Sequence, residues 1–333
     1  MQEAIEAKRR FSKIGWFYIA DVALIYIVQL LIGLVVRALK PGWLENADIT
    51  LLLSAISMYL VAFPLLMLLM KKKIPAEPVQ RRKLSPGKYM LAAVICMGMA
   101  YASNFAGNII TTVIGFATGN PVENQIASVM MSVSPWAVFF YTVLCAPIME
   151  EFVFRKLIVD RAVRYGEGIA VLTSGLMFGL FHGNLNQFIY AFIIGTMLAY
   201  LYVKTGNLKI TISLHMLFNF ISGFLTLLLM QKLDLGSMLE GGMVTTLPMP
   251  GPGPGSDTLI WWGLYGLLLL FILCILVAGL VLFIVFAAQK RFRFEPGNTA
   301  IPKELKFSIA FGNSGMLVFA LYWVFMIIKQ LLH

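Results

Sequence analysis

The chain has 333 residues, of which 59% are hydrophobic and 13% are charged. Soluble domains contain about 45–50% apolar and about 25% charged residues, and a soluble protein of this length could not keep so much apolar surface from water. The composition therefore predicts an integral membrane protein and excludes a soluble enzyme, a secreted disulfide scaffold and a disordered linker.

The formal net charge of +10 is concentrated in a few places. Of the 26 Lys and Arg residues, 22 lie in five segments between apolar runs: residues 8–13, 71–88, 155–164, 204–209 and 290–306. Basic clusters between spans follow the positive-inside rule, whereas a nucleic-acid-binding module carries a basic patch on a folded surface. We therefore expect the lipid bilayer as a partner, and no nucleic acid.

The first apolar run, residues 14–36, follows basic residues, as the apolar part of a signal peptide does. It is longer than the roughly 7–15 residues of a signal peptide and lacks a clear small-residue cleavage site, so we interpret it as a retained span. Asp21 lies two turns into this run. We expect it to have a structural role, paired with Lys13 or Arg10 or reaching the membrane interface.

Further runs approach the roughly 20 apolar residues that cross the hydrocarbon layer. They are residues 51–70, 89–117, 135–154, 168–182, 188–203, 210–230, 259–288 and 307–328. The runs 168–182 and 188–203 are short, so both full spans and half-buried helices remain open for them. The fold class expected is an all-α integral membrane protein, a polytopic bundle of eight to nine transmembrane helices. With the N-terminus in the cytoplasm, strict alternation of nine spans places all five basic segments inside.

Cysteine usage adds little to this prediction. Cys96, Cys145 and Cys274 all lie inside apolar runs at wide spacing, where we expect buried thiols. Such a pattern indicates neither a disulfide framework nor a metal site.

The fourth run carries two adjacent carboxylates, Glu150 and Glu151, and ionisable groups inside a span are functional candidates. Pro147 removes a backbone hydrogen bond and predicts a kink just before them. Adjacent residues of a helix point about 100° apart, so the two glutamates have different tasks. Arg155 follows Glu151 by four residues, the favourable order for an ion pair on one face. This pairing neutralises Glu151 and leaves Glu150 free.

Two histidines lie in the runs that follow. His182 comes four residues after Phe178, and His215 comes four residues before Asn219, so each pair shares one face of a helix. A lone buried histidine is usually structural, but two of them beside a glutamate pair indicate a site. The fourth and fifth runs could form an antiparallel hairpin that turns at Glu167. In that hairpin the positions of Glu150 and His182 along the helix axes differ by roughly 3 Å. Residues 155–165 are amphipathic. If they lay flat on the membrane, Glu150 and His182 would no longer lie at matching positions.

These residue types suit hydrolysis. A glutamate, alone or with a histidine, takes a proton from water, and a neutral histidine with an asparagine donates hydrogen bonds to an oxyanion. Glu150, His182 and His215 could instead bind zinc. Composition and spacing leave the two mechanisms open, and no Cys or Ser at these positions has the setting of an activated nucleophile.

The order of the three motifs resembles the CPBP family of CAAX proteases and bacteriocin-processing peptidases, also called the Abi family. The motifs are Glu150-Glu151-x-x-x-Arg155, Phe178-x-x-x-His182 and His215-x-x-x-Asn219, and the resemblance covers about residues 135–225. It implies a helical membrane fold with a catalytic cavity open to the cytoplasm and to lipid. It also implies intramembrane hydrolysis of a peptide bond.

The resemblance also implies roles for these residues. Glu150 activates water with the help of His182, while His215 and Asn219 stabilise the oxyanion. Glu151 and Arg155, with Phe178 beside them, hold the site in shape. The family is often named a metalloprotease, but a mechanism that requires no metal cofactor is favoured here, with zinc on Glu150, His182 and His215 as the alternative.

The chain then divides into four parts. We expect N-terminal spans over 1–134, a CPBP-like catalytic core over 135–230, a Gly/Pro-rich loop over 231–258 and two C-terminal spans over 259–333.

The function expected is an intramembrane endopeptidase of a membrane-associated peptide or protein, in a bacterial plasma membrane. With a bacterial host, a prenylated CAAX substrate is not expected. The alternatives are a non-catalytic binding or immunity protein of the same fold and a proton-coupled transporter. Substrate, cleavage site and oligomeric state are not defined by the sequence.

Overall fold

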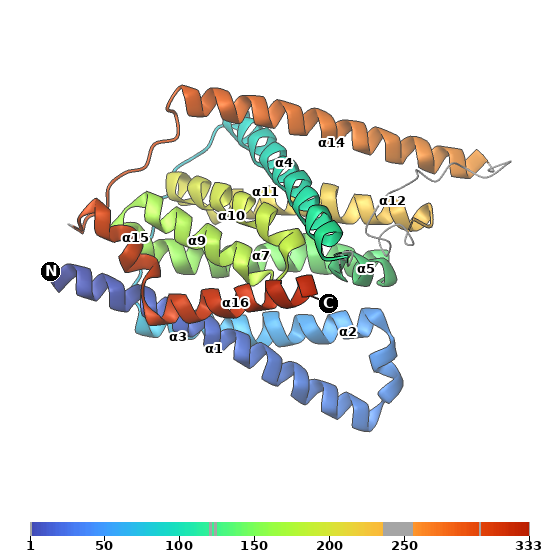
Figure 1. The fold of residues 1–333 in the computed structure, drawn as a ribbon, viewed down its shortest axis with the longest axis horizontal. Helices are drawn as coiled ribbons and strands as arrows, with labels where there is room; N and C mark the ends of the chain where they lie inside the picture. The colour runs from blue at the N-terminus through green and yellow to red at the C-terminus, as the bar shows by residue number, and fades with distance from the viewer. Residues whose placement is uncertain (1, 120–121, 123–124, 236–255, 300, 333) are drawn as a thin grey trace.

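The computed structural model describes residues 2–119, 122, 125–235, 256–299 and 301–332, and over these residues it contains helices and no strand (Figure 1). Eight of the described helices are long and apolar enough to cross a membrane. The predicted all-α polytopic architecture is therefore confirmed. Most of the predicted loop 231–258, residues 236–255, lies outside the described residues.

The eight candidate spans agree with eight of the nine predicted runs. They are Gln2–Leu39, Ala47–Lys73, Pro86–Thr118, Pro135–Tyr165, Leu185–Thr205, Leu208–Lys232, Asp257–Ala288 and Ser314–Leu332. The remaining run forms α9 (Glu167–Phe181), whose 15 residues extend only about 22 Å. Helix α9 is thus shorter than the roughly 30 Å hydrocarbon layer, and it lies inside the bundle instead of spanning it.

Several spans are single helices. These are α1 (Gln2–Leu39), α4 (Pro86–Thr118), α10 (Leu185–Thr205), α14 (Ser256–Ala288) and α16 (Ser314–Leu332). Besides α9, three shorter helices of the described residues lie outside the spans: the 3₁₀ turn Pro41–Glu45, α5 (Gln125–Ser132) and α15 (Lys303–Phe311).

The other three spans contain wide turns of π geometry. The second joins α2 (Ala47–Ala55) and α3 (Phe63–Lys73) through Ile56–Ala62. The sixth joins α11 (Leu208–Phe218) and α12 (Thr226–Lys232) through Asn219–Leu225. The fourth span runs through α6 (Pro135–Val138), Phe139–Cys145, α7 (Ala146–Glu150), Glu151–Val159, α8 (Asp160–Ala162) and the 3₁₀ turn Val163–Tyr165.

The wide turn Phe139–Cys145 lies just before Pro147, where the sequence predicts a kink. Proline has no N–H to donate to the preceding turn, and the N–H of Ala146 just before it bonds to the carbonyl of Tyr141, five residues back. Such turns often occur at functional sites. The helix continues without interruption through residues 155–165, so this segment does not lie apart from the span.

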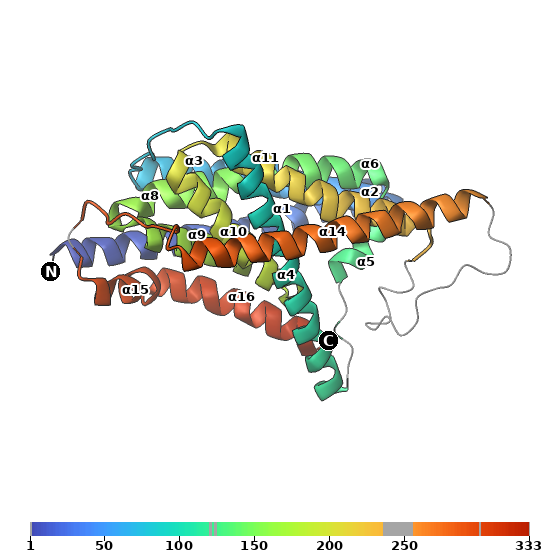
Figure 2. The same cartoon turned by 90° about the horizontal axis from the view of Figure 1, so that it is seen from above.

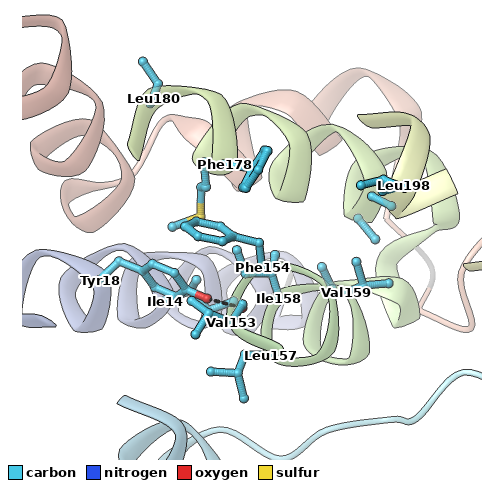
Figure 3. Close-up of a cluster of buried hydrophobic side chains, with 14 of the residues drawn as sticks. Ile14, Tyr18, Val153, Phe154, Leu157, Ile158, Val159, Phe178, Leu180 and Leu198 are labelled. Carbon is cyan, nitrogen blue, oxygen red and sulfur yellow. Dashed lines mark hydrogen bonds between the residues drawn. The ribbon is translucent and has the colours of Figure 1, made fainter. Parts of the chain in front are cut away.

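The fourth span and α9 form the expected hairpin around Gly166. The Ser174 hydroxyl donates to the Phe154 carbonyl at 2.8 Å, and the rings of Phe154 and Phe178 lie 5.2 Å apart. Tyr18 of α1 joins this core through a 2.6 Å hydrogen bond to the Val153 carbonyl (Figure 3). The core of the bundle therefore forms where α1, the fourth span and α9 meet.

Helices α9 and α10 pack with their backbones in close approach. A Cβ added to Gly175 would lie 2.2 Å from the Thr196 hydroxyl, and one added to Gly179 would lie 2.8 Å from the Phe192 side chain. The absence of a side chain at these positions lets the two helices approach each other. This packing positions the C-terminal end of α9, where His182 lies.

The turn between α9 and α10 is held by side-chain amides. Asn184 donates to the His182 carbonyl at 2.9 Å and accepts from the N–H of Gln187 at 2.8 Å. From α16, Gln330 accepts from the N–H of Leu185 at 3.0 Å. These bonds satisfy backbone groups that helix ends leave open.

One prediction about the C-terminal region differs from the structure. The apolar run 307–328 is broken, because α15 ends at Phe311 and α16 begins at Ser314. Asn313 causes the break: its amide donates to the carbonyls of Ile309 and Ala310, and its oxygen accepts from the N–H of Met316. This side chain ends one helix and caps the next, so the last span starts seven residues later than predicted.

The expected pairing of Asp21 is wrong. Asp21 is 4% exposed, and neither of its carboxylate oxygens has a hydrogen-bond partner among the described residues. Lys13 and Arg10 lie about 12 and 16 Å away along the helix, and Arg10 donates instead to the carbonyls of Pro75 and Arg161.

The prediction of three buried thiols is also wrong, since Cys145 and Cys274 are exposed on the surface of their spans.

Figure 1 shows α14 at the edge of the bundle, where it crosses α4 and lies apart from most other helices, and in Figure 2 it passes in front of the bundle. The crossing is at Gly98 and Gly279, where a Cβ added to Gly98 would lie 2.6 Å from the Gly279 Cα. The remaining surface of α14 is largely exposed and apolar, as expected for a helix that contacts lipid.

Candidate functional site

Three polar side chains form a buried cluster between the fourth span and α11. Glu151 and Arg155 are fully buried, and His215 is 4% exposed. Arg155 Nη2 lies 3.0 Å from Glu151 Oε1, and His215 Nδ1 lies 3.0 Å from the same oxygen. The predicted ion pair of Glu151 and Arg155 is confirmed, and His215 is a second partner that the sequence did not indicate.

The packing around the cluster explains how two charges are kept out of water. Removing an ion pair from water costs several kcal/mol per ion unless further contacts compensate. Here the Arg155 guanidinium stacks 4.4 Å above the Phe178 ring, in a cation–π contact. His215 adds a hydrogen bond to the carboxylate. Phe178 thus packs against the cluster from α9.

The contacts of His215 define the state of its two ring nitrogens. The Glu151 carboxylate is ionised beside Arg155 and accepts hydrogen bonds, so His215 Nδ1 carries the proton between them. His215 Nε2 points the other way and lies 3.8 Å from Glu150 Oε2. This separation exceeds a direct hydrogen bond and suits one bridging water.

Glu150 is the more accessible of the two glutamates, with 18% of its side chain exposed. Three tyrosines, Tyr59, Tyr141 and Tyr190, lie within electrostatic range of its carboxylate. The rings of Tyr59 and Tyr141 are 5.6 Å apart. Sequence reasoning missed these tyrosines, because an aromatic residue inside an apolar run has no pattern that separates it from core packing.

His182 lies at the C-terminal end of α9, next to the Phe178 ring. Its Nδ1 donates to the Phe178 carbonyl at 2.8 Å, since a carbonyl oxygen only accepts. The two rings meet edge to face at 4.8 Å, and the same Phe178 ring contacts His215 at 5.8 Å. The second nitrogen of His182, Nε2, is left as an acceptor in the neutral ring.

Asn219 begins the wide turn that follows α11. Its amide donates to the Thr142 carbonyl at 2.8 Å, on the wide turn before α7. One amide hydrogen is used in this bond, and the second hydrogen is available. The bond ties α11 to the helix that carries Glu150.

The structure therefore joins most of the predicted residues into one connected set. Glu150, Glu151, Arg155 and His215 are linked by polar contacts, and Phe178 bridges Arg155, His182 and His215 through its ring. Among the described residues, no hydrogen bond or ion pair links His182 or Asn219 directly to Glu150.

The zinc alternative named Glu150, His182 and His215 as ligands. Within the described part of the chain, no group of three or more His, Cys, Asp and Glu side chains is arranged to hold a metal ion. These residues do not fit a metal centre as placed, and no step below is derived through one.

These buried polar groups lie inside a bundle whose helices are long and apolar enough to cross a membrane. The family model for "Type II CAAX prenyl endopeptidase Rce1-like" proteins matches residues 132–221, which contain all three motifs. The segment that carries the motifs is therefore similar to this family of CAAX endopeptidases, in agreement with the resemblance of the motifs.

Two bacterial relatives agree with this family. The chain is 28% identical over 162 residues to the "Putative membrane peptidase YdiL" of Bacillus subtilis (strain 168), covering 48% of this chain and 66% of the relative, just under two thirds of its length. It is 25% identical over 219 residues to the "Membrane-embedded CAAX protease MroQ" of Staphylococcus aureus (strain USA300), covering 61% of this chain and 86% of the relative. No solved structure matches.

The comparisons identify membrane proteases as the relatives of this chain, and they suggest a bacterial origin. They give no support to the metalloprotease assignment.

Proposed function

We propose that this protein is an intramembrane endopeptidase that hydrolyses a peptide bond of a membrane-associated peptide or protein. The observation that carries the proposal is the 3.8 Å gap between Glu150 Oε2 and His215 Nε2, with His215 fixed from behind by Glu151. A water molecule that lies beside these two atoms contacts both, and the carboxylate can accept its proton.

The reaction begins with that water. Glu150 accepts one proton while the water oxygen attacks the carbonyl carbon of the substrate, and a tetrahedral intermediate with a negative oxygen forms. The C–N bond then breaks, and the proton held by Glu150 passes to the leaving nitrogen. Water is thus divided between the new carboxylate and the new amine, and no other reactant is needed.

The oxyanion is stabilised by donors that this site offers. His215 presents Nε2 to the reacting centre and donates to the oxyanion from this nitrogen when a proton is bound there. Asn219 contributes its second amide hydrogen, since the first is bound to Thr142. Donors fixed before the reaction stabilise developing charge without reorganising.

The remaining residues are positioning groups. Glu151 and Arg155 set the tautomer and the orientation of His215 through two contacts of 3.0 Å. The Nε2 atom of His182 accepts a hydrogen bond from a water molecule. Phe178 keeps both imidazole rings in place.

The surface beside Glu150 indicates how a substrate reaches the site. Ile148 and Phe152, on either side of Glu150 in sequence, are 38% and 40% exposed on a membrane span. A side chain exposed on a span faces lipid, so this face offers a lateral approach for a membrane-associated chain. The cytoplasmic position of the N-terminus and of the cavity remains our expectation from the charge pattern.

Hydrolysis is favoured over proton transport by the grouping of the polar residues. A relay places its ionisable groups in series across the membrane, whereas Glu150, Glu151, Arg155 and His215 lie within contact distance of one another.

The proposal is tested by comparing membrane-associated peptide termini in cells that express wild type, Glu150→Gln or Glu45→Gln at equal levels. Glu45 is exposed and lies outside the cluster, so it controls for the substitution itself. We expect termini that wild type and Glu45→Gln produce and Glu150→Gln does not. Identical termini in all three strains, with the cellular phenotype intact, would reject the proposal in favour of a binding or immunity protein.

A further inference from the structure

A second cavity lies far from the proposed active site, at the polar end of α1. It has a volume of about 310 Å³ and is bounded by α1, the end of α3, the end of the fourth span and the segment before α15. Arg164, on its wall, is 14 residues after Glu150 in sequence, or about 20 Å along the helix. The cavity is therefore separate from the Glu150 site.

Five cationic side chains line this cavity: Arg9, Arg10, Lys13, Lys73 and Arg164. Two carboxylates, Glu3 and Glu6, also line it, so the formal charge of its walls is five minus two, or +3. A concave site with this excess of positive charge attracts anions.

Some of these cations already have partners within the protein. Arg10 donates to the carbonyls of Pro75 and Arg161, and Arg164 lies 3.2 Å from the carboxylate of Glu77. These contacts join the helix ends around the cavity.

Arg9, Lys13 and Lys73 are different. All three are exposed, and no ion pair to them is formed among the described residues. They are the cations available to a ligand.

The cavity lies at the depth of the lipid headgroups. Lys13 is followed directly by Ile14, the first residue of the apolar run of α1, and Lys73 ends the second span. Arg164 is next to the end of the fourth span. Three boundaries between apolar and polar sequence therefore meet at this cavity, where phosphate groups of a bilayer are found and basic side chains attract them.

We propose that this cavity binds the phosphate of an anionic phospholipid headgroup through Arg9, Lys13 and Lys73. A volume of about 310 Å³ is at the small end of ligand pockets, and it accommodates a glycerophosphate headgroup while the acyl chains stay in the membrane. The bound phosphate joins α1 and α3, and it stabilises the end of the span that carries Glu150.

Stabilisation of the purified full-length chain by added ligands tests this site without measuring activity. The delipidated protein in a neutral detergent is titrated with short-chain phosphatidylglycerol, with phosphatidylcholine of the same chain length, or with inorganic phosphate, at constant ionic strength. The thermal midpoint is recorded for wild type, for the double variant Lys13→Gln/Lys73→Gln and for the matched control Lys8→Gln/Lys72→Gln. Lys8 and Lys72 are exposed neighbours that do not line the cavity.

We expect phosphatidylglycerol to raise the midpoint of wild type and control at similar concentrations. The cavity variant should need about thirty times more lipid, because two charge contacts are lost. Phosphatidylcholine should act more weakly. If inorganic phosphate stabilises with the same dependence on Lys13 and Lys73, the phosphate site is supported and its occupant is a soluble phosphate.

Two results would overturn the proposal. The first is equal loss of stabilisation in the cavity variant and in the control, which would show a general surface effect. The second is the absence of any shift in wild type with either phosphate ligand.

Discussion

The fourth span and α14 are helical runs of nearly equal length, with 31 residues in Pro135–Tyr165 and 32 in Asp257–Ala288. The fourth span buries two acidic and two basic side chains, Glu151, Arg155, Asp160 and Arg161, and contains two wide turns. In α14, by contrast, the only charged residue is Asp257, near its first turn, and the helix contains no wide turn. The comparison shows that length and apolarity define a span, whereas buried polar groups and irregular helix geometry mark the one that carries the site.

The largest effect we expect is the loss of turnover in Glu150→Gln, a substitution in the fourth span. Loss of a general base lowers turnover by about 10²–10⁴-fold, while the isosteric amide keeps the fold. Turnover of a peptide identified from the cellular termini, together with the thermal midpoint, measures both effects. Full activity in Glu150→Gln would remove Glu150 from the mechanism and weaken the contrast between the two spans.

Arg155→Ala should be the most destabilising single change. It leaves Glu151 buried without its cation, which costs about 3–5 kcal/mol in the free energy of unfolding, and it frees His215 to turn. Unfolding in denaturant and the rate of hydrolysis should both decline. Arg155→Lys keeps the charge but loses the stacking on Phe178, so it should lie between wild type and Ala. An unchanged midpoint in Arg155→Ala would show that the pair does not stabilise the fold.

In the apolar region, Gly279→Val should affect packing alone. Any Cβ at Gly279 would lie 2.3 Å from the Val94 carbonyl, and overpacking of this kind costs about 1–3 kcal/mol. Gly266→Val, on the same helix with no atom within 4 Å of its added Cβ, is the matched control. We expect a lower thermal midpoint for Gly279→Val only, and an unchanged turnover for both. A loss of turnover in Gly279→Val would show that α14 contributes to the site.

The smallest effect is expected at the break between α15 and α16. Asn313→Ala removes the cap of α16 and should cost about 0.5–2 kcal/mol of stability. Asn313→Asp keeps the oxygen that accepts from Met316 and should recover part of the loss. A scan of thermal midpoints separates the three proteins, and equal values would mean that the break is not maintained by this side chain.

Local features of the sequence predicted most of the fold and part of the site. The spans follow from apolar runs, and the Glu151–Arg155 pair follows from a spacing of four residues on one helix. The hydrogen bond between His215 and Glu151 joins residues 64 apart in sequence, and no local pattern indicates which histidine nitrogen points to which carboxylate.

Other features depended on tertiary structure or on a single side chain. The stacking of Arg155 on Phe178 needs the hairpin of the fourth span and α9, which places a residue of one helix over a residue of the other. The break at Asn313 lies inside a run that is apolar enough to span, so hydropathy conceals it. Asp21 was assigned partners that the length of a helix places out of reach.

The short helix α9 has a consequence for the supply of water. Because α9 extends only about 22 Å, less than the roughly 30 Å of the hydrocarbon layer, we expect the backbone and amide groups of the turn from His182 to Leu185 to lie inside that layer. Asn184 and Gln330 satisfy that backbone, and amide groups also bind water. We therefore expect this turn to shorten the dry path of a water molecule to Glu150, which the proposed hydrolysis needs as its second substrate.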